Sequence, residues 1–167
     1  MKRWIVFAFV CVPFAPLAQQ APKSGSQDEL AVQIKQGAEL HARAQLIVQT
    51  EDARAKLALC PKAVSTLDIN GCYNAELGTL NADYLRLVRT LGLLLRSGGD
   101  ANAAPKPISF DEAETAWSNY RDLACKAAGE QYEGGTIRPS IAMGCRITIT
   151  HHHIDELWAV YSDLGTR

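Results

Sequence analysis

Three consecutive histidines near the C-terminus are the residues best suited to metal chemistry. His151, His152 and His153 are followed closely by Asp155 and Glu156. On a helix, His151 with Asp155, or His152 with Glu156, would share one face, and imidazole and carboxylate are both zinc ligands. Consecutive helical residues point about 100° apart, so at most two of the histidines could reach one ion. We therefore expect a solvated, pH-sensitive helix face and assign neither a metal nor a cofactor.

Cysteines are the second set of residues with chemical potential. Cys11 lies in an apolar N-terminal run, and four others follow it: Cys60, Cys72, Cys125 and Cys145. An even number in an exported chain indicates disulfides, and the absence of a Cys-x-x-Cys step disfavours zinc. Four cysteines allow three pairings. We favour the two local ones, Cys60 with Cys72 and Cys125 with Cys145, because each closes a short connection between consecutive helices.

No residue pattern typical of catalysis occurs. The sequence contains no Gly-x-Ser-x-Gly motif, and no pair of carboxylates stands out from an ordinary helix surface. The formal net charge is −1, and removing the two positive charges of Lys2 and Arg3 would leave −3. This mild acidity argues against nucleic acid or anionic lipid as a partner. We predict a protein that is not an enzyme.

The first residues predict export. Lys2 and Arg3 precede an apolar run over residues 4–17, and the small residue Ala18 follows the run. This order is typical of a Sec signal peptide, and the run is too short to span a membrane. It predicts a periplasmic or secreted protein. We predict two N-terminal segments: a cleaved signal peptide over residues 1–18 and a flexible N-terminus over residues 19–27.

Helical periodicity continues through the rest of the chain and predicts an all-α, disulfide-bonded bundle of about four helices. The predicted elements are a long helical segment over residues 28–59 and helices from Tyr73 to Arg96, from Phe110 to Gln131, and from Pro139 onward. Asn70-Gly71 predicts a turn immediately before Cys72. Two apolar stripes follow helical spacing. They are a thin one at Leu30, Ile34, His41, Val48 and Leu59, and a strong one at Leu77, Leu80, Tyr84, Leu87, Leu91, Leu94 and Leu95.

An ordered series of residues between about 60 and 160 resembles the lysozyme-inhibitor LprI N-terminal domain family of small secreted bacterial proteins. Besides the four cysteines, the series comprises Leu80, Asn81, Tyr84, Trp117, Tyr120, Arg121, Asp122, Gly134, Gly135 and Thr150. The resemblance implies a helical domain over residues 60–164, with residues 28–59 outside it. Glu114 and His153 depart from the family pattern, which usually has Gln and Arg there, and both changes alter the local charge.

Trp117, Arg121 and Cys125 follow one another at four-residue steps and so form one stripe on a helix. We favour a structural interpretation of this stripe. Trp117 would fill the core, and Arg121 would pair with fixed acceptors on a neighbouring helix. Asn81 and Tyr84 would complete a buried polar network. The alternative is a surface patch that anchors a partner through tyrosine and arginine.

Gly134-Gly135 predicts a turn with positive φ, held in place by a Cys125–Cys145 bridge. Such a loop can present side chains to a partner. The candidate partner-binding residues are Glu130, Glu133 and Thr136. By resemblance, the partner is a lysozyme or another envelope protein, and acids such as these or Asp122 would occlude the cleft of a cationic enzyme. The alternative function is an envelope interaction or stress-tolerance module that targets another protein or a cell-wall fragment.

Overall fold

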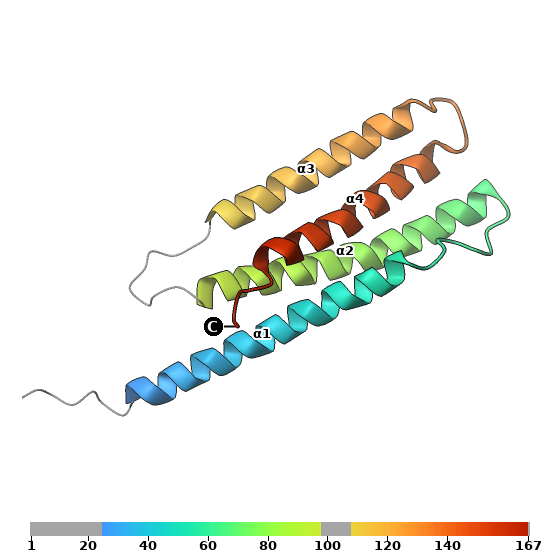
Figure 1. The fold of residues 1–167 in the computed structure, drawn as a ribbon. Coiled ribbons are helices and arrows are strands. Elements are labelled where there is room, and N and C mark those ends of the chain that lie inside the picture. Colours follow the sequence, from blue (N-terminus) through green and yellow to red (C-terminus); the bar gives the residue numbers. More distant parts are fainter. Residues whose placement is uncertain (1–24, 98–107, 167) are drawn as a thin grey trace, which may run out of the picture.

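The computed structural model describes residues 25–97 and 108–166. These residues form four helices, and no strand occurs among them, which confirms the predicted all-α class. The helices are α1 (Gly25–Ala55), α2 (Thr66–Ser97), α3 (Ile108–Glu130) and α4 (Arg138–Tyr161) (Figure 1).

The predicted signal peptide over residues 1–18 lies outside the described residues. Helix α1 begins inside the segment that we predicted to be flexible. None of the described helices has the length and apolar character needed to cross a membrane.

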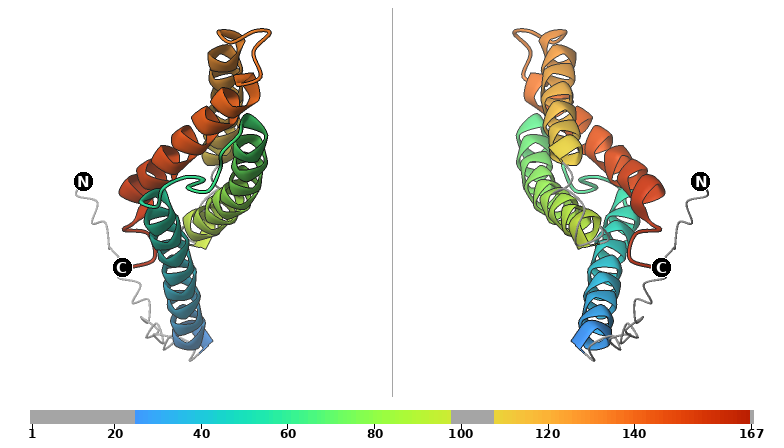
Figure 2. Two further views of the ribbon diagram at one scale, coloured as in Figure 1. Left: turned by 90° about the vertical axis from the view of Figure 1, so that its right-hand side faces the viewer. Right: turned by 90° about the vertical axis from the view of Figure 1, so that its left-hand side faces the viewer.

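Helix α4 is the shared neighbour of the other three helices. It packs against α1, α2 and α3, whereas α2 and α3 meet only briefly and α1 does not contact α3 within the described residues. Figures 1 and 2 show the resulting arrangement, in which α1 with α2 and α3 with α4 form two helical hairpins, and α4 lies between α3 and the other hairpin. Side chains that join the two hairpins must therefore lie on or beside α4.

The core confirms the predicted apolar face of α2. Leu80, Leu87 and Leu91 are completely buried, and Leu94 is almost so. Full burial of each leucine side chain stabilises the fold by about 2 kcal/mol. Tyr84 belongs to the same face of α2 and is also buried. The other helices contribute Ala44, Ile47, Val48, Phe110, Ile147, Ile154 and Leu157 to the core.

The apolar stripe predicted for the first helix is wrong at both ends. At its end, α1 stops at Ala55, and Leu59 lies beyond it and is 40% exposed. Leu30 and Ile34 are each 56% exposed. Figure 1 shows the reason, because the first turns of α1 extend past the end of the bundle. Packing begins at Gly37, whose backbone lies against Gly165: a Cβ built on Gly165 would be 2.9 Å from the Gly37 carbonyl oxygen. From there the buried face of α1 continues through Ala44 and its neighbours.

The turn predicted at Asn70-Gly71 is also wrong, because α2 begins at Thr66 and includes both residues. Ser65 and Asp68 stabilise this earlier start. The Asp68 amide donates to Ser65 Oγ at 3.2 Å, and the Ser65 amide donates to Asp68 Oδ2 at 3.1 Å. This reciprocal arrangement is a capping box with aspartate in the usual place of glutamate. Its hydrogen bonds, first the one from the Ser65 hydroxyl, hold the pKa of Asp68 below its ordinary value.

Each helical hairpin contains one disulfide. Cys60–Cys72 links the α1–α2 connection to the start of α2, with the Cα atoms 6.0 Å apart. Cys125–Cys145 links α3 to α4, with the Cα atoms 5.4 Å apart. These are the two sequence-local pairs that we favoured.

Candidate functional site

Arg121 joins α3 to both neighbouring helices. The residue is only 9% exposed, and its Nη1 donates to Asn81 Oδ1 at 3.1 Å and to Thr150 Oγ1 at 3.3 Å. The guanidinium carbon also lies 5.2 Å from the centre of the Trp117 ring, within cation–π range. Arg121 therefore serves the packing of the bundle, as in the structural interpretation, and does not form a surface patch.

A second buried polar cluster surrounds Glu114. The Tyr84 hydroxyl donates to Glu114 Oε2 at 2.9 Å, and His153 Nε2 lies 3.1 Å from the same oxygen. His153 Nδ1 lies 3.2 Å from Glu156 Oε2, and its ring stacks on Trp117 with 3.8 Å between the ring centres. Burial first, and the nearby Glu114 charge second, raise the pKa of Tyr84. The Tyr84 phenol therefore keeps its proton and donates it in the hydrogen bond to Glu114.

His153 lies between two carboxylates. Its Nε2 faces Glu114 Oε2 in the core, and its Nδ1 faces Oε2 of the exposed Glu156. The two positions that depart from the family pattern, Glu114 and His153, are therefore in direct contact. Sequence reasoning missed this pair because 39 residues separate its members.

The loop between α3 and α4 carries the predicted partner-binding residues. Glu133 and Thr136 are exposed in this loop, and Glu130 is exposed at the end of α3, 3.8 Å from Lys126 Nζ. Positive φ was predicted for both glycines, but only Gly134 has it, at 80°. Gly135 is constrained differently, because an added Cβ would lie 3.2 Å from the Tyr132 carbonyl oxygen.

Two further predicted residues flank this region on α3. Tyr120 is 63% exposed, so it belongs to the surface. Asp122 is also exposed, and its Oδ1 lies 3.2 Å from Arg121 Nε and 3.3 Å from Arg146 Nε. Because two guanidinium groups share this carboxylate, Asp122 offers less charge to a partner than Glu130 or Glu133 does.

The three consecutive histidines have three different environments. His151 is half-buried against α1, His152 is exposed, and His153 lies in the core. Across residues 25–97 and 108–166, no three histidine, cysteine or acidic side chains are arranged to hold a metal ion. The three histidines therefore do not form one solvated helix face, because only His152 is fully exposed to solvent.

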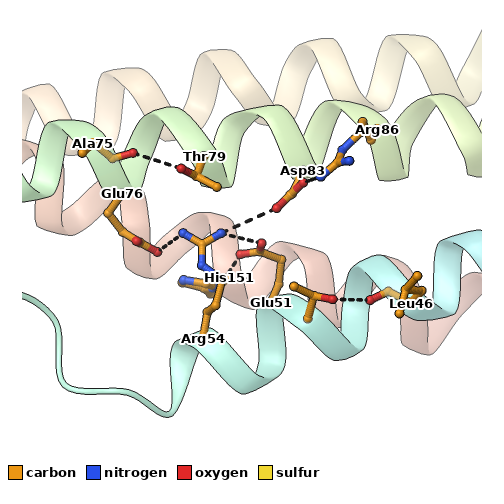
Figure 3. A network of polar contacts seen from close by, with 10 residues as sticks. Leu46, Glu51, Arg54, Ala75, Glu76, Thr79, Asp83, Arg86 and His151 are labelled. Atoms are coloured by element: carbon orange, nitrogen blue, oxygen red, sulfur yellow. Dashed lines mark hydrogen bonds and ion pairs between the residues drawn. The ribbon is translucent and has the colours of Figure 1, made fainter.

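A charged network between α1 and α2 was not predicted from the sequence. Arg54 Nη1 donates to Glu51 Oε1 at 2.7 Å, and Arg54 Nη2 donates to Glu76 Oε1 at 2.6 Å (Figure 3). Asp83 Oδ2 lies 3.6 Å from Arg54 Nη1, and Asp83 also pairs with Arg86. The guanidinium group of Arg54 on α1 thus contacts three carboxylates. One of them is on α1 itself, and the other two are on α2.

Burial shifts the pKa of two groups in this network, the buried Glu51 and the half-buried His151. Glu51 is 1% exposed, and its Oε2 has no hydrogen-bond partner among the described residues. His151 Nδ1 lies 3.8 Å from that oxygen. Burial raises the pKa of Glu51, against the opposing effect of Arg54. Burial likewise lowers the pKa of His151, against the effect of the nearby acids Glu76 and Asp155.

We expect His151→Gln to reduce the loss of stability on acidification. Because the pKa of His151 in the fold lies below the ordinary 6.5, the unfolded chain takes up this proton first as the pH falls. This preferential protonation of the unfolded chain lowers the free energy of unfolding of the native protein below about pH 6.5. Glutamine does not titrate, so the variant does not lose stability in this way. Urea unfolding at about pH 7.5 and about pH 5.5 measures the difference. His152→Gln, at the exposed neighbour, is the control, and equal losses in both variants would contradict the prediction.

Comparison with known proteins places the chain in a family. Residues 60–157 match the family model described as lysozyme inhibitor LprI. An uncharacterized protein from Rhizobium meliloti (strain 1021) is 34% identical over 104 residues, which cover 59% of this chain and 75% of the relative. No solved structure matches the chain. The matched region includes both disulfides, the Arg121 contacts and the α3–α4 loop. The chain therefore belongs to the lysozyme inhibitor LprI family.

Proposed function

We propose that this protein binds a lysozyme and inhibits it by covering the cleft of the enzyme. The family match over residues 60–157 carries the proposal, because the family is described by lysozyme inhibition. Such a function needs no catalytic group. It needs a rigid surface that fits the enzyme, and a surface ordered before binding loses less conformational entropy when the complex forms.

The α3–α4 loop is the surface that suits this role best. Its acids Glu130 and Glu133 are exposed beside Thr136, and the Cys125–Cys145 bridge joins the two helices that hold the loop. Short turns also order the loop, since the Tyr132 and Glu133 amides donate to the carbonyls of Gly129 and Glu130. An ordered acidic loop complements a cationic enzyme.

We also propose that the protein acts in the periplasm or outside the cell. Residues 1–18 have the basic, apolar and small-residue order of a signal peptide. Export would place both disulfides in an oxidising compartment, where they persist. It would also place the protein where it can meet a lysozyme.

Titration into a lysozyme turbidity assay tests the function. The protein is expected to slow lysis, and moderate salt is expected to weaken the effect, because salt screens exposed charges. The double variant Glu130→Gln/Glu133→Gln should inhibit roughly threefold less well, because it loses two charges that steer association. Asp111→Asn/Glu112→Gln removes two exposed acids from the other end of α3 and should leave inhibition unchanged.

Two results would contradict the proposal at different levels. Unchanged lysis at a large molar excess of the protein would exclude inhibition of that enzyme. Inhibition that is weakened equally by both double variants would retain the function but exclude the α3–α4 loop as the specific contact.

A further inference from the structure

A pocket of about 330 Å³ lies where the end of α1 and the following residues meet α2 and α4. Leu57, Leu59 and Ile147 provide apolar walls, and Glu76 and Asp155 provide carboxylates. Arg54, Leu57 and Leu59 precede residue 60, where the family match begins. The pocket is therefore built partly from a segment that the family match does not cover.

The charge of this pocket is negative despite the presence of Arg54. The guanidinium group of Arg54 is already shared among Glu51, Glu76 and Asp83. Asp155 has no cationic group within ion-pair distance in the described parts of the chain. Glu51 Oε2, which has no hydrogen-bond partner among the described residues, lies 3.8 Å from Nδ1 of His151, and His151 lines the pocket (Figure 3). Among the side chains that line the pocket, the two carboxylates of Glu76 and Asp155 thus outnumber the single guanidinium group of Arg54.

The shape of the pocket restricts which cation would fit. A bare metal ion is disfavoured, because no three ligating side chains converge in the described residues. The apolar walls suit a chain of methylene groups, and the carboxylates suit a charged group at its end. Lysine and arginine side chains have this combination of an apolar stem and a cationic head.

We propose that this pocket accepts a lysine or arginine side chain of a protein partner. The stem lies between Leu57, Leu59 and Ile147, and the cationic group is held by Asp155 and by the free oxygen of Glu76. Arg54 fixes the position of the Glu76 carboxylate through its bond to Oε1. This contact site is separate from the α3–α4 loop and does not depend on the partner being a lysozyme.

Titration with a short peptide tests the pocket without any partner protein. The probe is acetyl-Gly-Lys-Gly-amide, and the matched control peptide has norleucine in place of lysine. We expect the lysine peptide to shift the nuclear magnetic resonance signals of His151 and His152 saturably, with a dissociation constant on the order of millimolar. The norleucine peptide should not, and added salt should weaken the response.

A pair of charge-removing variants makes the test specific. Asp155→Asn should weaken peptide binding roughly threefold, because one of two carboxylates is lost from the cation site. Asp155 is exposed, so the variant should fold, which circular dichroism verifies. Glu112→Gln, at an exposed acid on α3, should leave binding unchanged. The proposal is overturned if no saturable shift occurs, if norleucine binds equally well, or if Asp155→Asn has no effect.

Discussion

Replacing Glu114 with alanine is expected to lower the free energy of unfolding by about 3 kcal/mol. Glu114 is the common partner of the Tyr84 hydroxyl and of His153 Nε2, and all three side chains are buried. Removing the carboxylate leaves the Tyr84 hydroxyl on α2 and the Nε2 atom of His153 on α4 without partners in the core. The loss of stability arises mainly from burying these polar groups without hydrogen-bond partners and less from the lost contact itself.

Urea unfolding of a double-mutant cycle measures the effect. Glu114→Ala and His153→Ala together should cost less than the sum of the two single changes, because removing both partners leaves fewer unpaired groups. Glu114→Gln should be milder than Glu114→Ala, since its amide oxygen can still accept from Tyr84. Glu112→Ala, on the exposed side of the same helix, is the control and should have little effect. Additive costs would show that Glu114 and His153 do not form a coupled pair.

Loss of the Cys125–Cys145 bridge is expected to destabilise the fold by about 3 kcal/mol, mainly by enlarging the unfolded ensemble. The residues are 20 apart in sequence, and the bridge connects α3 to α4, which is the helix on which α3 chiefly packs. The Cys125→Ala/Cys145→Ala variant, compared with the native protein by urea unfolding, measures this loss.

The Cys60→Ala/Cys72→Ala variant provides an internal comparison. Its residues are 12 apart, so the loop-closure argument predicts a slightly smaller loss. The two variants should also differ in where they act. Hydrogen exchange should increase at α3 in the first variant and at the end of α1 in the second. Uniform exchange across the bundle in both variants would contradict this local assignment.

Features set by local spacing could be predicted from the sequence. The apolar face of α2 repeats at three- and four-residue steps, and its members Leu80, Leu87, Leu91 and Leu94 are buried accordingly. The all-α class and the family resemblance followed from similarly ordered patterns. Local rules failed where a stronger local signal was overlooked, since the Ser65–Asp68 capping box starts α2 before Asn70-Gly71.

Features set by tertiary contacts could not be predicted in this way. Glu51 lies in an alanine-rich, polar stretch, and only its approach to Arg54 and His151 explains why it is buried. Leu30 and Ile34 have the right spacing for a core stripe, but the bundle ends before it reaches them. The predicted binding residues of the α3–α4 loop remain a prediction, because exposure alone does not identify a partner.

The placement of one bridge within each hairpin has a consequence for how the oxidised protein is made. Cys60 and Cys72 are synthesised before Cys125 and Cys145, and the bonds join them in the same order. An oxidant that links these cysteines as they emerge therefore forms the native pairs directly. Disulfide reshuffling takes seconds to hours, and this connectivity allows the nascent chain to mature without that slow correction.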